Sequence, residues 1–105
     1  MLVRPYNSRQ EMPVFGVYYV DGEAFCLCFP PGVGGLDALK LSDVELIDPT
    51  IWGKWVYREN NGFGVYHHAL VEGDLLEEIQ GYDEDAYKKF LDIIKAEGLV
   101  KPNFY

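Results

Sequence analysis

Two adjacent histidines and two closely spaced cysteines are the side chains with the greatest capacity for chemistry in this chain. His67 and His68 are its only histidines, and Cys26 and Cys28 are its only cysteines. Imidazole and thiolate groups bind zinc and copper, and histidine titrates near neutral pH, where it can act as a general base. A metal site or a catalytic centre would require these groups to converge with further ligands or with a nucleophile.

The local pattern argues against a metal site at these residues. Both segments have the composition of strands, and successive side chains on a strand point to opposite faces, so at most one histidine can join the two cysteines. That leaves three ligands for a tetrahedral ion, whereas small buried cysteines are common in sheets without any metal. The sequence therefore predicts no metal site and no cofactor.

The spacing of the cysteines also indicates their redox state. Residues two apart on a strand are separated by about 6 to 7 Å, from a rise of roughly 3.3 Å per residue. This separation is awkward for a disulfide between Cys26 and Cys28. We therefore expect reduced thiols and a cytoplasmic location.

A catalytic role for the histidines lacks an evident nucleophile. Ser8 and Ser42 are the only serines, and the apolar run around the cysteines would make their thiolates hard to form. The sequence predicts no catalytic residue, and an enzyme is the less favoured class. One alternative stays open, a small-ligand-binding or catalytic domain that uses a sheet face around Tyr57, Tyr66 and His68.

The most distinctive pattern is electrostatic. A stretch of fourteen residues contains seven acids and no lysine or arginine: Glu72, Asp74, Glu77, Glu78, Asp83, Glu84 and Asp85. Some of these acids belong to helix starts, but such a concentration of negative charge also accelerates the capture of a basic partner and can imitate nucleic-acid phosphate. Five nearby aromatic residues are of the kind that anchors protein interfaces: Trp52, Trp55, Tyr57, Tyr66 and Tyr82. These twelve residues form the predicted partner-binding surface.

Overall charge narrows the class of partner. The chain has 17 acidic and 9 basic residues, for a formal net charge of −8 at pH 7. Phosphate backbones and anionic membranes repel such a chain, so we expect no direct nucleic-acid binding. No apolar run is long enough to span a membrane, and the first residues lack the apolar stretch of a signal peptide. A basic protein is the natural complement.

The elements that position these residues begin with a β-hairpin. Two β-rich runs, 14–20 and 23–29, flank Asp21-Gly22, a preferred two-residue turn. Such a turn pairs Val20 with Glu23, Tyr18 with Phe25 and Val17 with Cys26. Strict alternation gives two apolar faces. One carries Val14, Tyr18, Val20, Phe25, Leu27 and Phe29, and the other carries Phe15, Val17, Tyr19, Ala24, Cys26 and Cys28. Both faces must be covered, one by a helix and the other by a loop, a partner or a second sheet.

The rest of the chain predicts further strands followed by helices. We expect a short helical turn at 36–41, a strand at 44–48 and a second hairpin with arms 54–58 and 63–68 around Asn60-Asn61-Gly62. Asp74 begins a capping box for a short helix through Ile79. A longer helix, 84–97, is capped by Asp83 and followed by Gly98.

This order predicts an α+β fold. We expect one domain over residues 1–105, with a strongly twisted antiparallel sheet of about five strands, an SH3-like half-barrel, packed with a C-terminal helix. Residues 1–12 are polar and non-periodic, and we expect a loosely ordered N-terminal arm.

The leading functional hypothesis is a non-enzymatic module that presents its acidic and aromatic surface to a basic protein. In size, acidity and aromatic content the chain resembles the small immunity proteins that bacteria make against basic nuclease toxins, which implies an inhibitor-type function. The resemblance is one of general character and involves no motif. A structural homodimer that covers the second face of the first hairpin is a further alternative.

Overall fold

The computed structural model describes residues 1–59 and 62–104 and confirms the α+β class. Within these ranges one antiparallel sheet contains seven strands: β1 (Leu2–Pro5), β2 (Met12–Val20), β3 (Glu23–Cys28), β4 (Asp37–Lys40), β5 (Val44–Asp48), β6 (Trp55–Glu59) and β7 (Phe63–His67). The helices follow the strands: α1 (His68–Val71), α2 (Leu76–Gln80) and α3 (Glu84–Ala96), with a short 3-10 turn, η1 (Leu41–Asp43), between β4 and β5. No described helix is long and apolar enough to cross a membrane.

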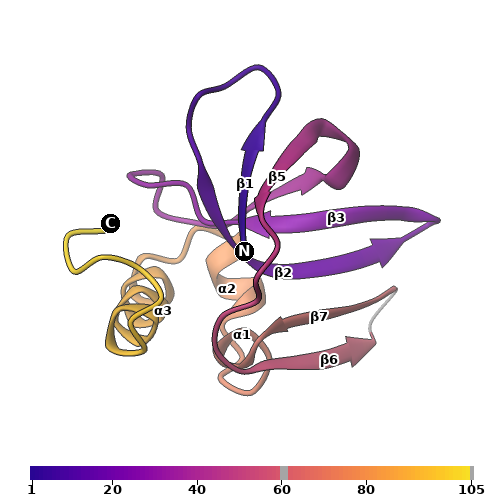
Figure 1. Ribbon diagram of the computed structural model, residues 1–105. Coiled ribbons are helices and arrows are strands. Elements are labelled where there is room, and N and C mark those ends of the chain that lie inside the picture. Colours follow the sequence, from indigo (N-terminus) through magenta and orange to yellow (C-terminus); the bar gives the residue numbers. More distant parts are fainter. Residues whose placement is uncertain (60–61, 105) are drawn as a thin grey trace.

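Strand β2 is the centre of the sheet. Along one edge it pairs with β3, and along the other it pairs with β1 near its start and with β7 near its end. Strands β4, β5 and β6 extend the sheet beyond β3, β1 and β7. Figure 1 shows β2 and β3 side by side, with β1 and β5 above them and β7 and β6 below. A sheet divided in this way around one long strand is compatible with an SH3-like half-barrel.

The first hairpin has the predicted turn and register. Asp21 and Gly22 have φ angles of 51° and 78°, the left-handed backbone that a two-residue hairpin turn requires. Val20 pairs with Glu23, and the two pairs predicted further along the hairpin are also present. The strong turn signal therefore fixed the alignment of β2 with β3.

A β-bulge corrects the predicted faces of this hairpin. The register shifts between Val14 and Gly16, so Phe15 is an extra residue in β2. Phe15 consequently packs with Leu27 and Phe29 in one core cluster, while Val14 packs with the two cysteines in the other. Strict alternation assigned Val14 and Phe15 to the opposite faces, because it assumed an uninterrupted strand.

Both faces of the first hairpin are covered, as its apolar character predicts. Helix residues Leu70, Ile79, Phe90 and Ile94 pack on the face that carries Phe29, and all are fully buried. On the other face, Val3 of β1 and Val44 of β5 complete a second cluster with Cys26 and Cys28. The sheet therefore covers its own second face by bending.

Two predictions of local structure are wrong. Residues 1–12 were expected to form a loose arm, yet Leu2–Pro5 is a strand between β2 and β5, and Val3 is fully buried. Residues 36–41 were expected to contain a helical turn, but 37–40 extend the sheet as β4 beside β3. In both cases pairing with a distant strand outweighs weak local preference.

The helix boundaries follow one predicted cap and depart from another. The Ala86 backbone N–H donates a hydrogen bond to Asp83 at the start of α3 (2.9 Å), and Gly98 after its end has a φ of 72°, as predicted. The capping box at Asp74 is wrong, because Asp74 is left-handed, with a φ of 55°, and α2 begins later without a side-chain cap. In the second hairpin, Glu59 pairs with Phe63; the predicted turn residues Asn60 and Asn61 lie outside the described residues.

Candidate functional site

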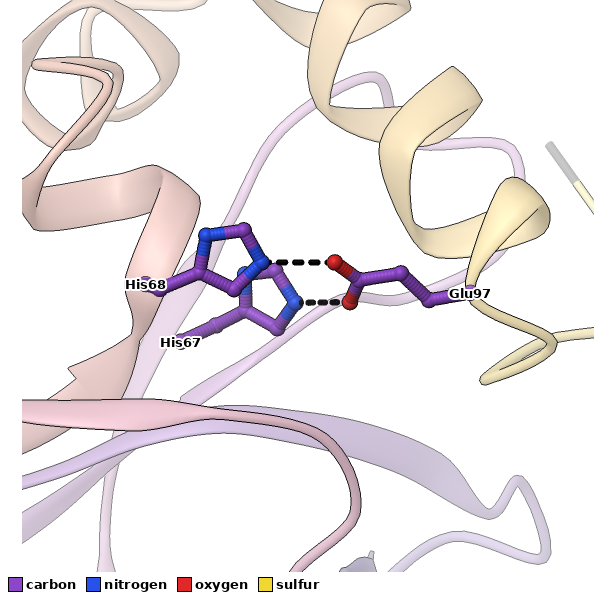
Figure 2. Close-up of side chains that lie close together, drawn as sticks. All are labelled: His67, His68 and Glu97. Atoms are coloured by element: carbon purple, nitrogen blue, oxygen red, sulfur yellow. Dashed lines mark hydrogen bonds and ion pairs between the residues drawn. The ribbon is translucent and has the colours of Figure 1, made fainter.

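One carboxylate and two histidines meet where β7 passes into α1 (Figure 2). His67 is the last residue of β7, His68 is the first of α1, and Glu97 directly follows α3. The His67 Nε2 atom lies 2.6 Å from Glu97 Oε1, and the His68 Nε2 atom lies 2.6 Å from Glu97 Oε2. One carboxylate thus binds two neighbouring imidazole rings, whose centroids are 4.3 Å apart. We call these three residues the His–Glu cluster.

The change from strand to helix explains why adjacent histidines point the same way. His67 keeps an extended backbone, with φ −50° and ψ 138°, and His68 begins the helix. The alternation of side chains along a strand therefore stops at His67. The expectation that the two histidines occupy opposite faces is wrong for this reason, because it assumed that the strand continues through His68.

Hydrogen bonds establish which ring nitrogens carry protons. An ionised carboxylate only accepts hydrogen bonds, so each Nε2 atom donates to Glu97. The Nδ1 atom of His67 accepts a hydrogen bond from the Ala69 backbone N–H (3.2 Å), which caps α1. His67 therefore has its proton on Nε2 and links the start of α1 to the end of α3.

The two histidines differ in burial. The His67 side chain has no exposed surface, and its ring contacts Phe15 and Phe90 edge to face. The His68 side chain is 27% exposed, and its Nδ1 atom lies 3.8 Å from a Glu72 oxygen. His67 thus belongs to the core, while His68 lies at the surface of the cluster.

Burial and pairing shift two pKa values in the cluster. Burial lowers the pKa of His67, although the bond to Glu97 opposes this shift. Burial alone would raise the pKa of Glu97, but the hydrogen bonds from His68 and His67 outweigh it and lower that pKa. Near neutral pH the cluster therefore contains an ionised carboxylate and a neutral His67.

The cluster has the atoms of a metal site but lacks the surroundings of one. One ligand atom from each residue lies within 4.8 Å of the others. A metal on the Nε2 atom of His67 would move the proton to Nδ1, and metal-bound histidines donate that second proton to an acceptor. Here Nδ1 faces the Ala69 N–H, itself a donor. The arrangement fits a hydrogen-bonded latch between α1 and α3 better than it fits a metal centre.

The cysteines and serines supply no nucleophile to this cluster. Among the described residues, no serine or cysteine is hydrogen-bonded to either histidine. Cys26 and Cys28 are free, fully buried and 3.5 Å apart at their sulfurs, in the second core cluster. The contact with Cys26, together with burial, raises the pKa of Cys28. The thiols therefore act as core packing, without a link to the histidines.

Cationic partners from elsewhere neutralise part of the acidic stretch. Glu77 binds Arg58 of β6 at 2.6 Å, Glu72 lies 3.4 Å from Lys54, and Glu84 pairs with Lys88 of α3. The expectation of seven uncompensated acids is therefore wrong for these three. Asp74, Glu78 and Asp85 are exposed and have no ion pair among the described residues.

The predicted aromatic residues do not form one surface. Tyr66 is buried in the core, and the exposed Tyr82 donates a hydrogen bond to Asp37, at the β4 end of the sheet. Trp52 and Trp55 are half-buried and joined by a hydrogen bond from the Trp55 indole to the Trp52 carbonyl. Of the five, Tyr57 alone is an exposed side chain on the second hairpin.

The alternative ligand face also comes apart in the structure. Tyr57 pairs with Val65 while Val56 pairs with Tyr66, so Tyr57 and Tyr66 lie on opposite sides of the sheet. Tyr66 lines a cavity of about 160 Å³ with Tyr18 and Arg58, and neither Tyr57 nor His68 lines it. The three residues therefore do not define one site.

Tyr57 instead lies on a face that sequence reasoning missed. Tyr19 and Phe63 are cross-strand partners in β2 and β7, and their rings stack with centroids 5.4 Å apart. Tyr57 is on the same side of the sheet, two strands from Tyr19. The exposed fractions of Tyr19, Phe63 and Tyr57 are 45%, 51% and 58%. We call these three residues the aromatic face.

Glu97 was missed as a site residue for a different reason. It lies about thirty positions from the histidines and was assigned only as the end of a helix. One signal was available, since the C-terminal end of a helix has a partial negative charge and disfavours a carboxylate. An acid at that position is stabilised only if donors approach it, and here they are the two imidazoles.

Comparisons with family models, with curated proteins and with solved structures find no match to this chain.

Proposed function

We propose that this protein is a non-enzymatic module that binds a basic protein, and that the aromatic face and the free edge of β6 make the contact. The observation that carries this proposal is the gathering of Tyr19, Tyr57 and Phe63 on one exposed side of the sheet. Large aromatic side chains anchor protein interfaces, and soluble proteins rarely expose several of them together without a use.

The edge of the sheet supports the same surface. Within the described residues β6 pairs with β7 and with no other strand, so its outer backbone groups are available to another chain. A strand from a partner can add to such an edge through main-chain hydrogen bonds. Side chains on its aromatic side would then contact Tyr57, whose hydroxyl is bound to Glu59 at 2.7 Å.

Charge favours a basic partner. On the side of β6 away from the aromatic face, Arg58 is bound by Glu77 of α2. The neighbouring Asp74 and Glu78 are exposed and have no ion pair among the described residues. These two acids and the net charge of −8 attract cationic proteins and repel anionic ones. The proposal therefore replaces the original set of twelve residues with a smaller one centred on β6.

An immunity or inhibitor function in the cytoplasm is the specific form of this proposal. The free thiols of Cys26 and Cys28 are consistent with a reducing compartment. A competing form is a homodimer through the same face, which would cover the aromatic residues without any basic partner.

A matched capture experiment tests the proposal. Immobilised wild-type protein is compared with a Tyr57→Ser/Phe63→Ser variant and with a Tyr6→Ser control, in host lysate at low and high salt. Tyr6 is 67% exposed and lies after β1, away from the aromatic face. We expect a basic protein that wild type and the control retain, that high salt releases, and that the double variant loses.

The contradicting outcomes are specific. The surface assignment fails if the double variant captures the same proteins as the control. The basic-partner form fails if Asp74→Lys/Glu78→Lys leaves capture unchanged relative to Asp92→Lys, an exposed acid on α3. Sedimentation of the purified protein as a dimer that Tyr57→Ser dissociates would assign the face to self-association instead.

A further inference from the structure

A second concave surface lies between the start of the sheet and the C-terminal segment. This groove has a volume of about 730 Å³, within the range of small-molecule sites. Its apolar wall comes from residues distant in sequence: Leu2, Pro13, Trp52, Leu99, Val100 and Phe104. None of the aromatic-face residues lines it, so it is separate from the surface proposed above.

Several contacts hold the two walls of this groove in place. The Phe104 ring lies 5.6 Å from Phe29 of the core, and the Leu99 N–H donates to the Ile94 carbonyl of α3 at 2.9 Å. Trp52 is held by the hydrogen bond from Trp55. Glu97 fixes the residue before Gly98 through the His–Glu cluster. A groove that exists before binding spares a ligand the cost of ordering it.

The charges at the groove differ from those of the rest of the chain. Lys95 of α3 and Lys101 of the C-terminal segment both line it, with the single acid Glu11. Neither lysine has an ion pair among the described residues, whereas Lys40, Lys54 and Lys88 each bind a glutamate. Two unpaired cations beside an apolar wall, in a chain with excess acid, complement an anionic group attached to an apolar body.

We propose that this groove binds a monomeric alkyl carboxylate. The alkyl chain packs on Trp52, Leu99 and Val100, and the carboxylate pairs with Lys95 and Lys101. The volume favours a single small amphiphile, and the lysines favour a charged head group over a neutral one. This inference is independent of the proposed protein partner, because it uses different residues.

Calorimetry with decanoate, well below its micelle concentration, tests this proposal. We expect saturable binding of one decanoate per chain. Octanoate should bind about fifteenfold more weakly, because it buries two fewer methylene groups. A Lys95→Ala/Lys101→Ala variant should lose about tenfold in affinity, from two partly exposed ion pairs. Decanol should bind wild type about as weakly as decanoate binds that variant.

The control is Lys89→Ala, which removes another exposed, unpaired lysine of α3 that does not line the groove. Circular dichroism melts check that each variant folds. The proposal is overturned by non-saturable heats, by equal affinity for decanol and decanoate, or by equal losses in the double variant and the control. Binding to anionic phospholipid vesicles or to an acidic peptide without binding of decanoate would also overturn it.

Discussion

The two hairpins of this protein are built from similar residues but differ in how their faces are used. In the first, β2–β3, helices cover one face and β1 with β5 cover the other, so Leu27 and Cys26 are both fully buried. In the second, β6–β7, the inner face carries the buried Tyr66, while Tyr57 and Phe63 project from the outer face. Exposed aromatic residues on a sheet are therefore informative here because the same sheet covers them elsewhere.

The second hairpin also ends in the His–Glu cluster, whereas the first ends in a plain turn and a loop. His67 and His68 connect β7 to the end of α3 through Glu97. The hairpin that carries the proposed binding face is thus anchored by polar contacts at one end. The predictions below test this contrast, beginning with the largest effect.

Truncation within the first hairpin should cause the largest loss of stability. Leu27→Ala removes a fully buried side chain from the main core cluster and leaves a cavity. We expect a loss of about 3 kcal/mol in the free energy of unfolding. Urea denaturation measures it, with Leu46→Ala as the control, because Leu46 is half-exposed in β5. Equal losses in the two variants would contradict the described core.

The inner face of the second hairpin should tolerate added volume poorly. A Cβ atom on Gly64 would lie 2.4 Å from the Tyr18 Cβ atom and 2.5 Å from the Val17 carbonyl oxygen. Backbone must therefore move, and Gly64→Ala should cost about 2 kcal/mol. The same denaturation experiment measures this change. A neutral result would mean that β7 lies further from β2 than the structure places it.

Neutralising the carboxylate of the His–Glu cluster should have a moderate effect. Glu97→Gln retains one acceptor but turns an amide donor toward the second imidazole, leaving a donor unsatisfied. We expect a loss of about 1 to 3 kcal/mol at pH 7. Glu72→Gln is the control, because its exposed pair with Lys54 contributes less than about 1 kcal/mol.

Acid should weaken the same anchor in two stages. The folded pKa of His67 is below its ordinary value of 6.5, so the unfolded chain takes up this proton more readily, and stability falls as the pH drops below about 6.5. The folded pKa of Glu97 is below 4.5, so its contribution is present above that pH and is lost as the pH falls through the folded pKa.

Denaturation at pH 7.5, 5.5 and 4 measures both stages. Relative to wild type, His67→Asn should reduce the slope between pH 7.5 and 5.5. Glu97→Gln should chiefly reduce the fall at the lowest pH. Unchanged slopes in both variants would show that the cluster does not link protonation to folding.

The outer face of the second hairpin should have the smallest effect on stability. Tyr57 and Phe63 are more than half exposed, so Tyr57→Ser/Phe63→Ser should change the free energy of unfolding by less than about 1 kcal/mol. This result, paired with lost capture of a partner, would separate a binding role from a structural one. A loss as large as that of Leu27→Ala would assign these rings to the core.

Local signals accounted for the elements whose cause is local. The Asp21-Gly22 turn aligned the first hairpin, Asp83 began α3, and Gly98 followed its end. The prediction failed for Leu2–Pro5 and for β4, since each becomes a strand only by pairing with a neighbour distant in sequence. It also failed at Phe15, where a one-residue bulge exchanges the two faces.

By itself the sequence determined the class of fold, the first hairpin, the long helix and the excess of acid, because each depends on composition or on residues a few positions apart. Tertiary structure alone decided which side chains meet. Glu97 reaches two histidines about thirty residues away, Tyr19 stacks on Phe63, and Lys95 with Lys101 borders a groove lined by Leu2. The physical reason is that contacts between distant segments depend on how strands pair and bend, and no local propensity encodes that choice.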